Sequence, residues 1–583
     1  MTIQLQNLHR LDKHFEYLKS LTSHETLFFV GGSIRDLLLG VVDEPTDLDI
    51  TTAGEPSAIF DSITKKDISI FKTDKFGTIT LIPKPTPITA KLFGEMPGDL
   101  KYELTPLRLE GGYEDFRHPW EIQRTPELIL DSNRRDFTIN CLYYTSFSFS
   151  KKLNPGTQTS VSVTELTKNL VKDWFFIDAE ARILILQNHE LIEEFFSDWK
   201  LNTKKLSALI EKNGATSEGT WGVVVDPHLG IQDIVDRTLR AVWKPDKRFQ
   251  EDALRIIRAL RLVNILNDKL FQYGQHNFFD FETPTWRSLK KNYYLVQFLA
   301  KERIKDELVK VFKGNNPFGF IALLDETNIL KYLFPQLHAT KGVHQPVRYH
   351  PFDVFAHTLL VLYHLQQLNT NYLVKLGTLY HDVWKTDQYY VYTIGLQEEE
   401  ARHIHGSWLN HSNSGSDMAQ KDFSALWFSN KEVEEISWYV KMHMKPGEIL
   451  DAKPENRPKK IRKMLSENWF DRVNNLFDIC KADRLGQFNT LQAPSLHQVD
   501  ELKEILTDLF DREGQFDLKA LDINGNDLMT SLKLKPGPIV KELLDLALQR
   551  VSSDIAARNQ KKTIVEYLKN IMKTRKKEEK SKK

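Results

Sequence analysis

Two aspartates, Asp47 and Asp49, stand two positions apart in the segment TDLDIT (46–51). On a β-strand this spacing makes both carboxylates project from the same face of the sheet. Paired carboxylates can hold divalent metal ions, and a site with two such ions can catalyse nucleotidyl transfer. We therefore predict that Asp47 and Asp49 are catalytic residues and ligands of Mg²⁺.

The segment FFVGGSIRDLLLG (28–40) precedes these aspartates and predicts a strand, a tight turn and a short helix. Gly31 and Gly32 lack a Cβ atom, so the backbone at the turn can come close to a phosphate group. The amides at the start of the helix would point toward that phosphate. We assign both glycines and Arg35 to nucleotide binding, because the turn and the aspartate pair together indicate a function that neither indicates alone.

The segment YELTPLRLEGGYEDFRHP (102–119) supplies a third acidic group to this expected site. Glu103 falls on a predicted strand and is a candidate third metal ligand, although an exposed strand carboxylate would fit the same pattern. Arg108 follows near the end of that strand. We include Arg108 in the expected nucleotide-binding set.

The segment RRDFTINCL (134–142) carries cationic and amide groups in a more specific pattern. Arg134 or Arg135 can bind triphosphate oxygens through a planar guanidinium group. Asp136 can accept hydrogen bonds from the ribose hydroxyls, and Asn140 can reach a phosphate or a metal-bound water. We expect these residues to bind the nucleotide.

The segment FQEDALRIIRALRL (249–262) predicts a single helix with Asp252 and Arg255 on one face, which Arg258 continues. Cytosine and adenine both present an exocyclic amine beside a ring-nitrogen acceptor, which suit an aspartate and an arginine respectively. Uracil and guanine present a carbonyl and a ring N–H there, and each unsatisfied polar group costs about 1–3 kcal/mol. The pair could therefore select C and A, although a surface ion pair would have the same spacing.

These motifs together resemble the class II nucleotidyltransferase family, which contains tRNA CCA-adding enzymes and bacterial poly(A) polymerases. The resemblance implies an enzyme that adds or repairs the 3′-terminal CCA of tRNA from CTP and ATP and releases pyrophosphate. Asp252 and Arg255 would choose the base, so that the protein replaces a nucleic-acid template. The helical half of the chain would hold the tRNA by its shape and backbone.

A second set of ligand-type residues lies in the C-terminal half, and their order and spacing resemble the HD phosphohydrolase superfamily. The six residues are His357, His381, Asp382, His411, His443 and Asp483. Imidazole and carboxylate groups together suit a divalent transition metal of the Mn, Ni, Fe or Co type. The resemblance implies hydrolysis of 2′,3′-cyclic phosphate ends or of nucleotides. Trp384 departs from the family, which usually has a glycine at that position.

Composition limits the class of protein. The 583 residues include 79 basic and 79 acidic side chains, so the overall charge does not indicate a partner. Only two cysteines, Cys141 and Cys480, are present, which argues against a disulfide scaffold and fits a reducing compartment. The polar N-terminus shows no secretory signal, and no long apolar run predicts a membrane span. We expect a cytoplasmic protein without a membrane partner.

The expected fold class is α+β, with a mixed-sheet nucleotidyltransferase head followed by an all-α neck, an HD domain and a tail. Short strands are expected near 78–82 and 101–107, and the segment 84–99 is expected to be a loop. The expected parts are a head (1–145), an insertion of unknown role (146–222), a neck with the base-selecting motif (223–330), an HD domain (331–490), a tRNA-binding tail (491–572) and a disordered charged end (573–583).

Three alternatives remain open at this level. A poly(A) polymerase could use the same head, although polymerases of that family generally lack an HD-like domain. An enzyme that adds only CC or only A would share all the motifs above. In a different class, an HD phosphohydrolase or RNA-binding protein could carry a vestigial head, but the complete aspartate and arginine sets argue against this.

Overall fold

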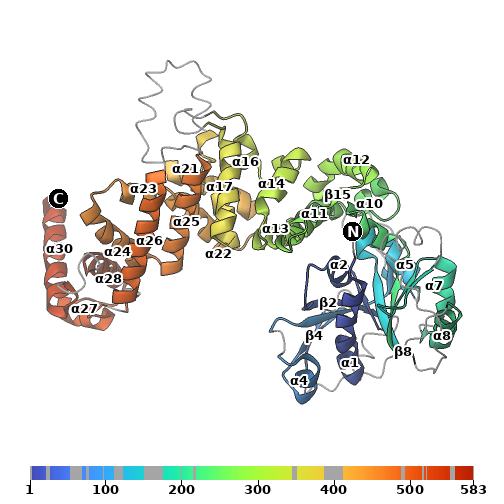
Figure 1. Cartoon of the computed structure of the whole chain (residues 1–583). Coiled ribbons are helices and arrows are strands. Elements are labelled where there is room, and N and C mark those ends of the chain that lie inside the picture. The colour runs from blue at the N-terminus through green and yellow to red at the C-terminus, as the bar shows by residue number, and fades with distance from the viewer. Residues whose placement is uncertain are drawn as a thin grey trace. The chain divides into compact units, whose positions relative to one another are not determined.

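The chain forms two compact units, residues 1–303 and residues 304–583, whose division falls within helix α13 (Lys301–Lys313). Figure 1 shows the computed structural model, in which strands occur in the first unit and the second unit is built from helices. The structure describes residues 3–21, 27–52, 68–73, 78–95, 98–110, 122–125, 127–149, 175–197, 200–213, 218–344, 351–386, 411–487, 493–514, 518–519, 521–551 and 558–581.

The first unit contains a nine-stranded sheet with the order β3-β4-β5-β2-β1-β8-β13-β10-β9. The pairs β2–β5 and β10–β13 are parallel, and the other six pairs are antiparallel. The mixed sheet confirms the expected α+β class. Its strands are β1 (Leu27–Val30), β2 (Asp47–Thr52), β3 (Ile68–Thr73), β4 (Thr78–Pro83), β5 (Lys101–Pro106), β8 (Tyr143–Phe149), β9 (Phe175–Asp178), β10 (Ile183–Leu186) and β13 (Gly219–Val225).

The segment 146–222, which we expected to be an insertion, contributes to this sheet. Strand β8 runs across the expected boundary at residue 145, and β13 pairs with it along seven residues. The run ILIL (183–186) is buried on both faces of the sheet, as is typical of an interior strand. The separate insertion is therefore wrong for its described part, because apolar strands complete one edge of the head sheet.

Helices cover both faces of the sheet. On one face Phe15 of α1 (Asp12–Leu21) packs edge-on against Phe29, with ring centroids 4.5 Å apart. On the other face α7 (His189–Phe195) and α8 (Thr203–Lys212) share a core with Phe28 and Trp221. The remaining elements of the sheet region are η1 (Leu5–Leu11), α2 (Gly32–Leu39), α4 (Pro87–Phe93), α5 (Leu128–Asn133), η2 (Thr138–Asn140) and the short hairpins β6–β7 (Arg108–Glu110, Ile122–Arg124) and β11–β12 (Phe196–Ser197, Lys200–Leu201).

Two local expectations in the first unit are wrong. The segment 84–99 contains helix α4, because Thr86 caps it through a reciprocal pair of hydrogen bonds with Thr89 and Pro87 suits its first turn. The expected single helix over 249–262 is broken at Asp252, whose backbone is extended. The elements that follow β13 are α9 (Gly230–Val235), β14 (Thr238–Leu239), α10 (Pro245–Glu251), α11 (Leu254–Gln272), β15 (Asp280–Phe281), α12 (Thr283–Asn292) and η3 (Tyr293–Phe298).

The second unit has two described hydrophobic cores. One lies among α17, α22, α24, α25 and α26, and the other joins α27, α28 and α30. The charged end expected to be disordered is helical to Ser581, since lysine and glutamate are good helix formers. The helices are α14 (Pro317–Glu326), α15 (Leu330–Leu333), α16 (Pro335–Ala339), α17 (Val354–Leu368), α18 (Tyr372–Thr378), α21 (His411–Ala425), α22 (Asn430–Met442), α23 (Lys445–Leu450), η5 (Pro454–Asn456), α24 (Arg457–Glu467), α25 (Phe470–Gly486), α26 (Ala493–Glu513), α27 (Gly525–Leu532), α28 (Pro538–Val551) and α30 (Lys561–Ser581). Every helix in the described part of the chain is too short or too polar to cross a bilayer.

Candidate nucleotidyl-transfer and metal sites

Strands β2 and β5 bring three acidic side chains together. They are parallel neighbours, and their register sets Asp49 opposite Glu103 and Asp47 opposite Lys101. Alternation along β2 leaves Asp47 and Asp49 exposed while Leu48 between them is buried. Cross-strand partners share a face of the sheet, so all three carboxylates project from the same side. The structure thus brings the predicted catalytic aspartates and Glu103 together, as the sequence indicated.

The charges of this carboxylate group are only partly balanced. The Lys101 ammonium lies 3.2 Å from Oδ1 of Asp47 and 3.1 Å from Oε1 of Glu103. Although Asp49 is exposed as a residue, neighbouring protein groups partly desolvate its carboxylate, and the negative charges of Asp47 and Glu103 add to this effect, so the pKa of Asp49 rises to about 6. Clustered carboxylate oxygens are the donors that Mg²⁺ takes from proteins, so these residues fit the expected ion.

The glycine turn lies directly beside this carboxylate group. Gly31 has φ +80° and precedes α2, which begins at Gly32. A Cβ atom at Gly31 would lie 3.9 Å from Oδ2 of Asp49 and 3.8 Å from the carbonyl oxygen of Asn140. The turn therefore places the start of α2 next to the carboxylates, and Arg35 of α2 donates a hydrogen bond to the Asn140 side chain.

Ser33, the second residue of α2, was not selected from the sequence as a ligand. Its hydroxyl is buried and has no hydrogen-bond partner within the described residues. A buried polar atom without a partner is unusual in a native protein and suits an absent ligand. A serine directly after the glycine pair was the available signal, but serine is also a common residue at the start of any helix.

Asp131 organises the arginine segment and was also missed from the sequence. Its fully buried carboxylate accepts from Arg134 at 2.6 Å, from Arg135 at 2.9 Å and from the Tyr143 hydroxyl at 2.8 Å. Burial opposes ionisation of this carboxyl group, but the two guanidinium groups lower its pKa to about 2. The backbone amide of Arg108 also donates to Asp131. Asp131 therefore holds both predicted phosphate-binding arginines in fixed positions.

Asp136, the expected ribose acceptor, is bound by protein groups in this structure. Its carboxylate accepts from Arg258 at 2.6 Å and from the Asn140 amide at 3.2 Å. Burial works against the charge of Asp136, but Arg258 and these hydrogen bonds hold its pKa well below the usual range. The segment Arg134–Asn140 and helix α11 are therefore joined through one ion pair.

The predicted base-selecting residues do not share one helix face. Asp252 follows the last residue of α10, while Arg255 is the second residue of α11. The Asp252 carboxylate accepts two hydrogen bonds from Arg303, at 2.8 and 3.2 Å. The buried Arg255 donates to the carbonyl oxygens of Arg248 and Arg134. The backbone break between the helices changes the expected i, i+3 geometry, although both residues stay at the same junction.

The HD-type residues of the second unit form a compact cluster. Nε2 of His357 on α17 lies 3.0 Å from Oδ1 of Asp483 on α25 and 3.7 Å from Oδ2 of Asp382. Nε2 of His381 lies 3.3 Å from Oδ2 of Asp382. The ring of His443 follows α22 and lies 5.5 Å from that of His381. His357, His381 and Asp382 are the one such group in the described residues whose ligand atoms lie within 4.8 Å of one another.

The three histidines are oriented so that Nε2 faces the cluster. Each Nδ1 atom lies near a backbone carbonyl, at 2.8 Å for His381, 2.7 Å for His443 and 3.4 Å for His357. Nε2 of His443 is buried without a hydrogen-bond partner in the described part of the chain, and the buried Nε2 of His381 faces the Asp382 carboxylate. Metal-binding histidines are held in this way, with the second ring nitrogen donating to a carbonyl. This donor set fits a divalent transition metal.

Two further positions complete the comparison with the expected HD set. His411 begins α21, but its side chain lies outside the described part of the structure. Trp384, the departure from the family pattern, is buried beside Gly415. A Cβ atom at Gly415 would lie 3.3 Å from this indole, so the glycine leaves the space that the large ring occupies.

The comparisons with known proteins agree with this geometry. Residues 27–156 match the family model for the poly A polymerase head domain, and residues 354–485 match the HD domain model. Residues 278–341 match a model described as "Probable RNA and SrmB-binding site of polymerase A". Residues 461–568 match a model for domain 2 of tRNA nucleotidyltransferase. Part by part, the chain is therefore similar to the poly(A) polymerase/tRNA nucleotidyltransferase family.

Curated relatives of the chain carry the description CCA-adding enzyme. The protein from Anoxybacillus flavithermus is 28% identical over 54% of this chain and 53% of its own length. The protein from Lactobacillus helveticus is 27% identical over 49% and 46%, respectively, so the chain spans about half the length of these relatives. The protein from Staphylococcus haemolyticus is 24% identical over 89% of this chain and 87% of its own.

A solved structure supports the fold of this chain. The crystal structure of the Bacillus stearothermophilus CCA-adding enzyme in complex with CTP superposes with a TM-score of 0.51 at 20% identity. The match covers 98% of this chain and 99% of that one.

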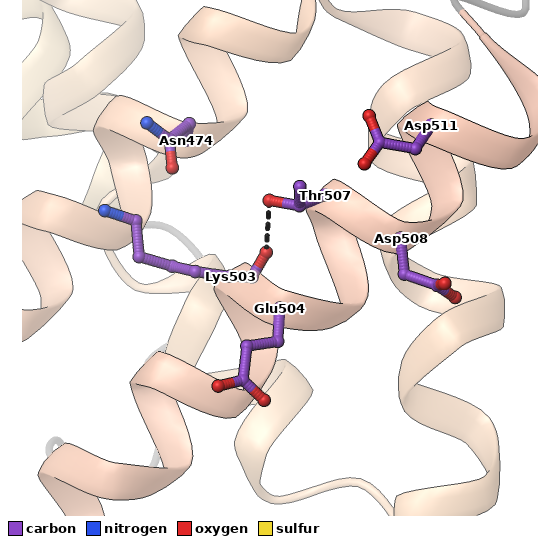
Figure 2. A pocket seen from close by; sticks show the side chains of 6 residues that line it. All are labelled: Asn474, Lys503, Glu504, Thr507, Asp508 and Asp511. Atoms are coloured by element: carbon purple, nitrogen blue, oxygen red, sulfur yellow. Dashed lines mark hydrogen bonds between the residues drawn. The ribbon is translucent and has the colours of Figure 1, made fainter.

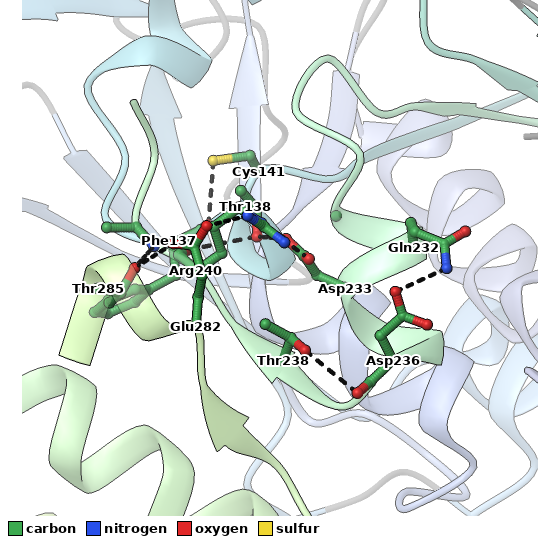
Figure 3. Close-up of polar contacts among 12 residues, drawn as sticks. Phe137, Thr138, Cys141, Gln232, Asp233, Asp236, Thr238, Arg240, Glu282 and Thr285 are labelled. Carbon is green, nitrogen blue, oxygen red and sulfur yellow. Dashed lines mark hydrogen bonds and ion pairs between the residues drawn. The ribbon is translucent and has the colours of Figure 1, made fainter. Parts of the chain in front are cut away.

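A second polar network in the first unit holds the segment 137–141 (Figure 3). The Thr138 hydroxyl donates to Asp233 at 2.6 Å, and Arg240 binds the same carboxylate at 3.0 Å. Arg240 also contacts Glu282, which accepts from the Thr285 hydroxyl at 2.7 Å. These contacts join the segment 137–141 to α9, to Arg240 directly after β14 and to the start of α12, and they explain why residues after 223 belong structurally to the head unit.

An open pocket in the second unit lies on α25 and α26 and, unlike the two candidate sites, contains no cluster of predicted ligand residues (Figure 2). Its lining consists of Asn474, Lys503, Glu504, Thr507, Asp508 and Asp511. The single lysine binds Asp478, which leaves the three acidic side chains unbalanced by it. This surface repels phosphate groups and is unsuited to nucleotide binding.

Proposed function

We propose that the protein is a template-independent tRNA nucleotidyltransferase that builds the 3′-terminal CCA from CTP and ATP. The observation that carries this proposal is the register of β2 and β5, which groups Asp47, Asp49 and Glu103 beside the turn at Gly31. The relatives described as CCA-adding enzymes support the choice of reaction. The same proposal makes tRNA the macromolecular partner and the cytoplasm the compartment.

In this proposal Mg²⁺ held by Asp47 and Asp49 would activate the tRNA 3′-hydroxyl and neutralise charge on the triphosphate. Glu103 adds a third carboxylate on the neighbouring strand. The turn at Gly31 leaves room for a phosphate group beside Asp49. Arg134 and Arg135, fixed by Asp131, provide positive charge for the triphosphate. Attack of the hydroxyl in line with the leaving group then expels pyrophosphate.

Base selection would involve the junction between α10 and α11. Asp252 would accept from the exocyclic amine of cytosine or adenine, and Arg255 would donate to the ring nitrogen. Both side chains are hydrogen bonded to protein groups in this structure. Base selection therefore requires that Asp252 release Arg303 and bind the base, and that Arg255 release one backbone carbonyl and bind the ring nitrogen. The exchange keeps the buried groups hydrogen bonded in both states, as their burial demands.

The deciding experiment measures incorporation of labelled CTP and ATP, separately and together, into defined RNAs. The substrates are tRNA ending before CCA, tRNA ending in CC, and an RNA that is not a tRNA. Addition of three nucleotides that stops on tRNA supports the proposal. Long A tracts on any RNA would identify a poly(A) polymerase, partial addition would identify a CC- or A-adding enzyme, and no incorporation with Mg²⁺ would refute transfer by the head.

We propose a second, metal-dependent phosphohydrolase activity for the HD cluster. The observation that favours it is the pair of buried Nε2 atoms of His381 and His443: that of His443 lacks a hydrogen-bond partner in the described residues, and that of His381 lies 3.3 Å from the Asp382 carboxylate. His357, Asp382 and Asp483 would complete the ligand set, and the fold supplies their orientation. Metal analysis and assays with RNA 2′,3′-cyclic phosphate ends and nucleotides test this activity. Unchanged metal content and hydrolysis after His381→Ala plus Asp382→Ala would refute it.

A further inference from the structure

Trp243 is a large aromatic residue in an unfavourable position. It lies between β14 and α10, its backbone has φ +61°, and 62% of its surface is exposed. A bulky residue in the left-handed region is strained, and an exposed indole gains nothing from burial. Strain and exposure alone do not make a site, since Trp427 in the other unit has φ +63° and is 66% exposed. The contacts of Trp243 distinguish the two.

The indole of Trp243 is fixed to the nucleotide-binding segment. Its Nε1 donates to the Asn133 side chain at 2.9 Å, and Asn133 directly precedes the arginine pair. The amide of Val242, one residue before the tryptophan, donates to the Asp136 carbonyl at 3.1 Å. The ring also packs edge-on against His228, with centroids 6.0 Å apart. The orientation of the exposed ring is therefore set by the same segment that carries Arg134 and Asp136.

Two lysines follow Trp243 closely in the sequence. Lys244 and Lys247 are exposed, and within the described residues neither side chain makes an ion pair. A fixed aromatic face beside free ammonium groups is the arrangement that binds single-stranded nucleic acid, because bases stack on the ring and phosphates bind the cations.

We infer that Trp243 is a stacking platform for the 3′-terminal base of the RNA that is being extended. This inference rests on the proposed nucleotidyl transfer. Each addition changes the terminal base, and stacking tolerates such changes because every base has a π-face. The incoming nucleotide is a poorer fit, since its base would be read by Asp252 and Arg255, of which Arg255 is only 6% exposed.

The test compares Trp243→Leu with Trp243→Phe, which keeps an aromatic face. Initial rates are measured against tRNA ending before CCA and, separately, against CTP, and RNA binding is measured without nucleotide at fixed salt. We expect Trp243→Leu to raise the KM for RNA and weaken RNA binding by about 5- to 150-fold, as stacking energies imply, with the KM for CTP unchanged. Trp243→Phe should restore most of the loss.

Trp427→Leu is the matched control, because Trp427 has the same exposure and backbone conformation. An RNA with 2-aminopurine at its 3′ end should be quenched by the wild type and by Trp243→Phe, and not by Trp243→Leu. An unchanged KM for RNA in Trp243→Leu, an equal loss in Trp427→Leu, or a raised KM for CTP alone would overturn the inference. A wild-type protein that incorporates no nucleotide would instead refute the proposed function.

Discussion

Asp49 in the head and Asp382 in the helical unit are both candidate metal ligands, yet their surroundings shift their pKa values in opposite directions. Shielding by the protein and the charges of Asp47 and Glu103 raise the pKa of Asp49. Burial also opposes the charge of Asp382, but Lys385 at 2.6 Å and the neighbouring histidines hold its pKa well below the usual range. The carboxylate group of the head therefore carries excess negative charge, whereas the negative charge of the HD cluster is balanced by Lys385 and the histidines.

This difference separates two ways of building a metal site. The head carboxylates reach solvent on strands β2 and β5, so bound cations would relieve their repulsion without any rearrangement of a core. The HD cluster is buried and its rings are fixed by carbonyl groups, so its geometry exists before any ion arrives. We expect weak, exchangeable ions in the first site and a retained ion in the second.

The largest expected effect comes from removing the charge of the head site. Asp47→Asn plus Asp49→Asn should lower incorporation of CTP and ATP by at least about 1,000-fold, because the ions contribute several kcal/mol to the transition state. Binding of tRNA should persist. Asp43→Asn plus Glu44→Gln, which changes two exposed carboxylates just before β2, is the matched control. Retained incorporation in the double aspartate variant would show that these residues do not hold the catalytic ions.

The second prediction concerns the retained ion. His381→Ala plus Asp382→Ala should reduce bound transition metal by at least about 100-fold, since even the supporting residues of such sites contribute 10- to 100-fold. Nucleotide incorporation by the head should continue. The control is His338→Ala plus Asp325→Asn, in the same unit. Metal content by mass spectrometry decides the outcome, and metal lost equally in both variants would argue against the cluster.

Asp252→Asn tests whether the junction of α10 and α11 reads the base. An amide can donate as well as accept, so it should accommodate the uracil carbonyl. We expect discrimination between CTP and UTP to fall by about 5- to 150-fold, the equivalent of 1–3 kcal/mol. Competition between the two nucleotides measures the ratio, with Asp268→Asn on α11 as the control. An unchanged ratio would leave base selection to other residues.

The smallest expected effect is on stability. Because the folded pKa of Asp49 is about 6, above its ordinary value of 3.8, the folded state binds the proton more tightly than the unfolded state does. Stability should therefore fall as the pH rises from about 4 to 6. Asp49→Asn should remove this dependence and stabilise the ion-free protein at pH 7 by less than about 1 kcal/mol after solvent screening. Denaturant unfolding of both proteins at pH 4.5 and pH 7.5, without divalent ions, measures the effect, and an Asp49→Asn variant that is less stable than the wild type at pH 7.5 would contradict it.

The sequence predicted which residues lie together in both candidate sites better than it predicted their contacts. Asp47 and Asp49 could be placed on one face because a strand has a fixed period of two, and the pairing of β2 with β5 then brought Glu103 to them. The role of Asp131 could not be predicted, since a buried carboxylate that binds two arginines needs knowledge of the tertiary packing. The ion pair between Asp252 and Arg303 could not be predicted either, because it joins residues 51 positions apart in the sequence.

The boundaries of the domains were harder to predict from the sequence than the fold class. The segment after residue 146 begins with polar serine-rich sequence, which concealed the strands that follow it. Strands β9 and β10 are short and apolar, and only their pairing through β13 to β8 shows that they belong to the head. The helix over 249–262 was predicted without its break, because no proline or glycine marks the extended backbone at Asp252.

Three guanidinium groups join the arginine segment of the head to α10 and α11. Arg248 donates to the carbonyl of Arg135, Arg255 donates to that of Arg134, and Arg258 binds the carboxylate of Asp136. The junction of α10 and α11, which would recognise the base, is thereby joined to the arginine segment, which would bind the triphosphate. A lineage evolving a different nucleotide preference could not alter one part in isolation, so accepted substitutions at these two places should be inherited as correlated sets.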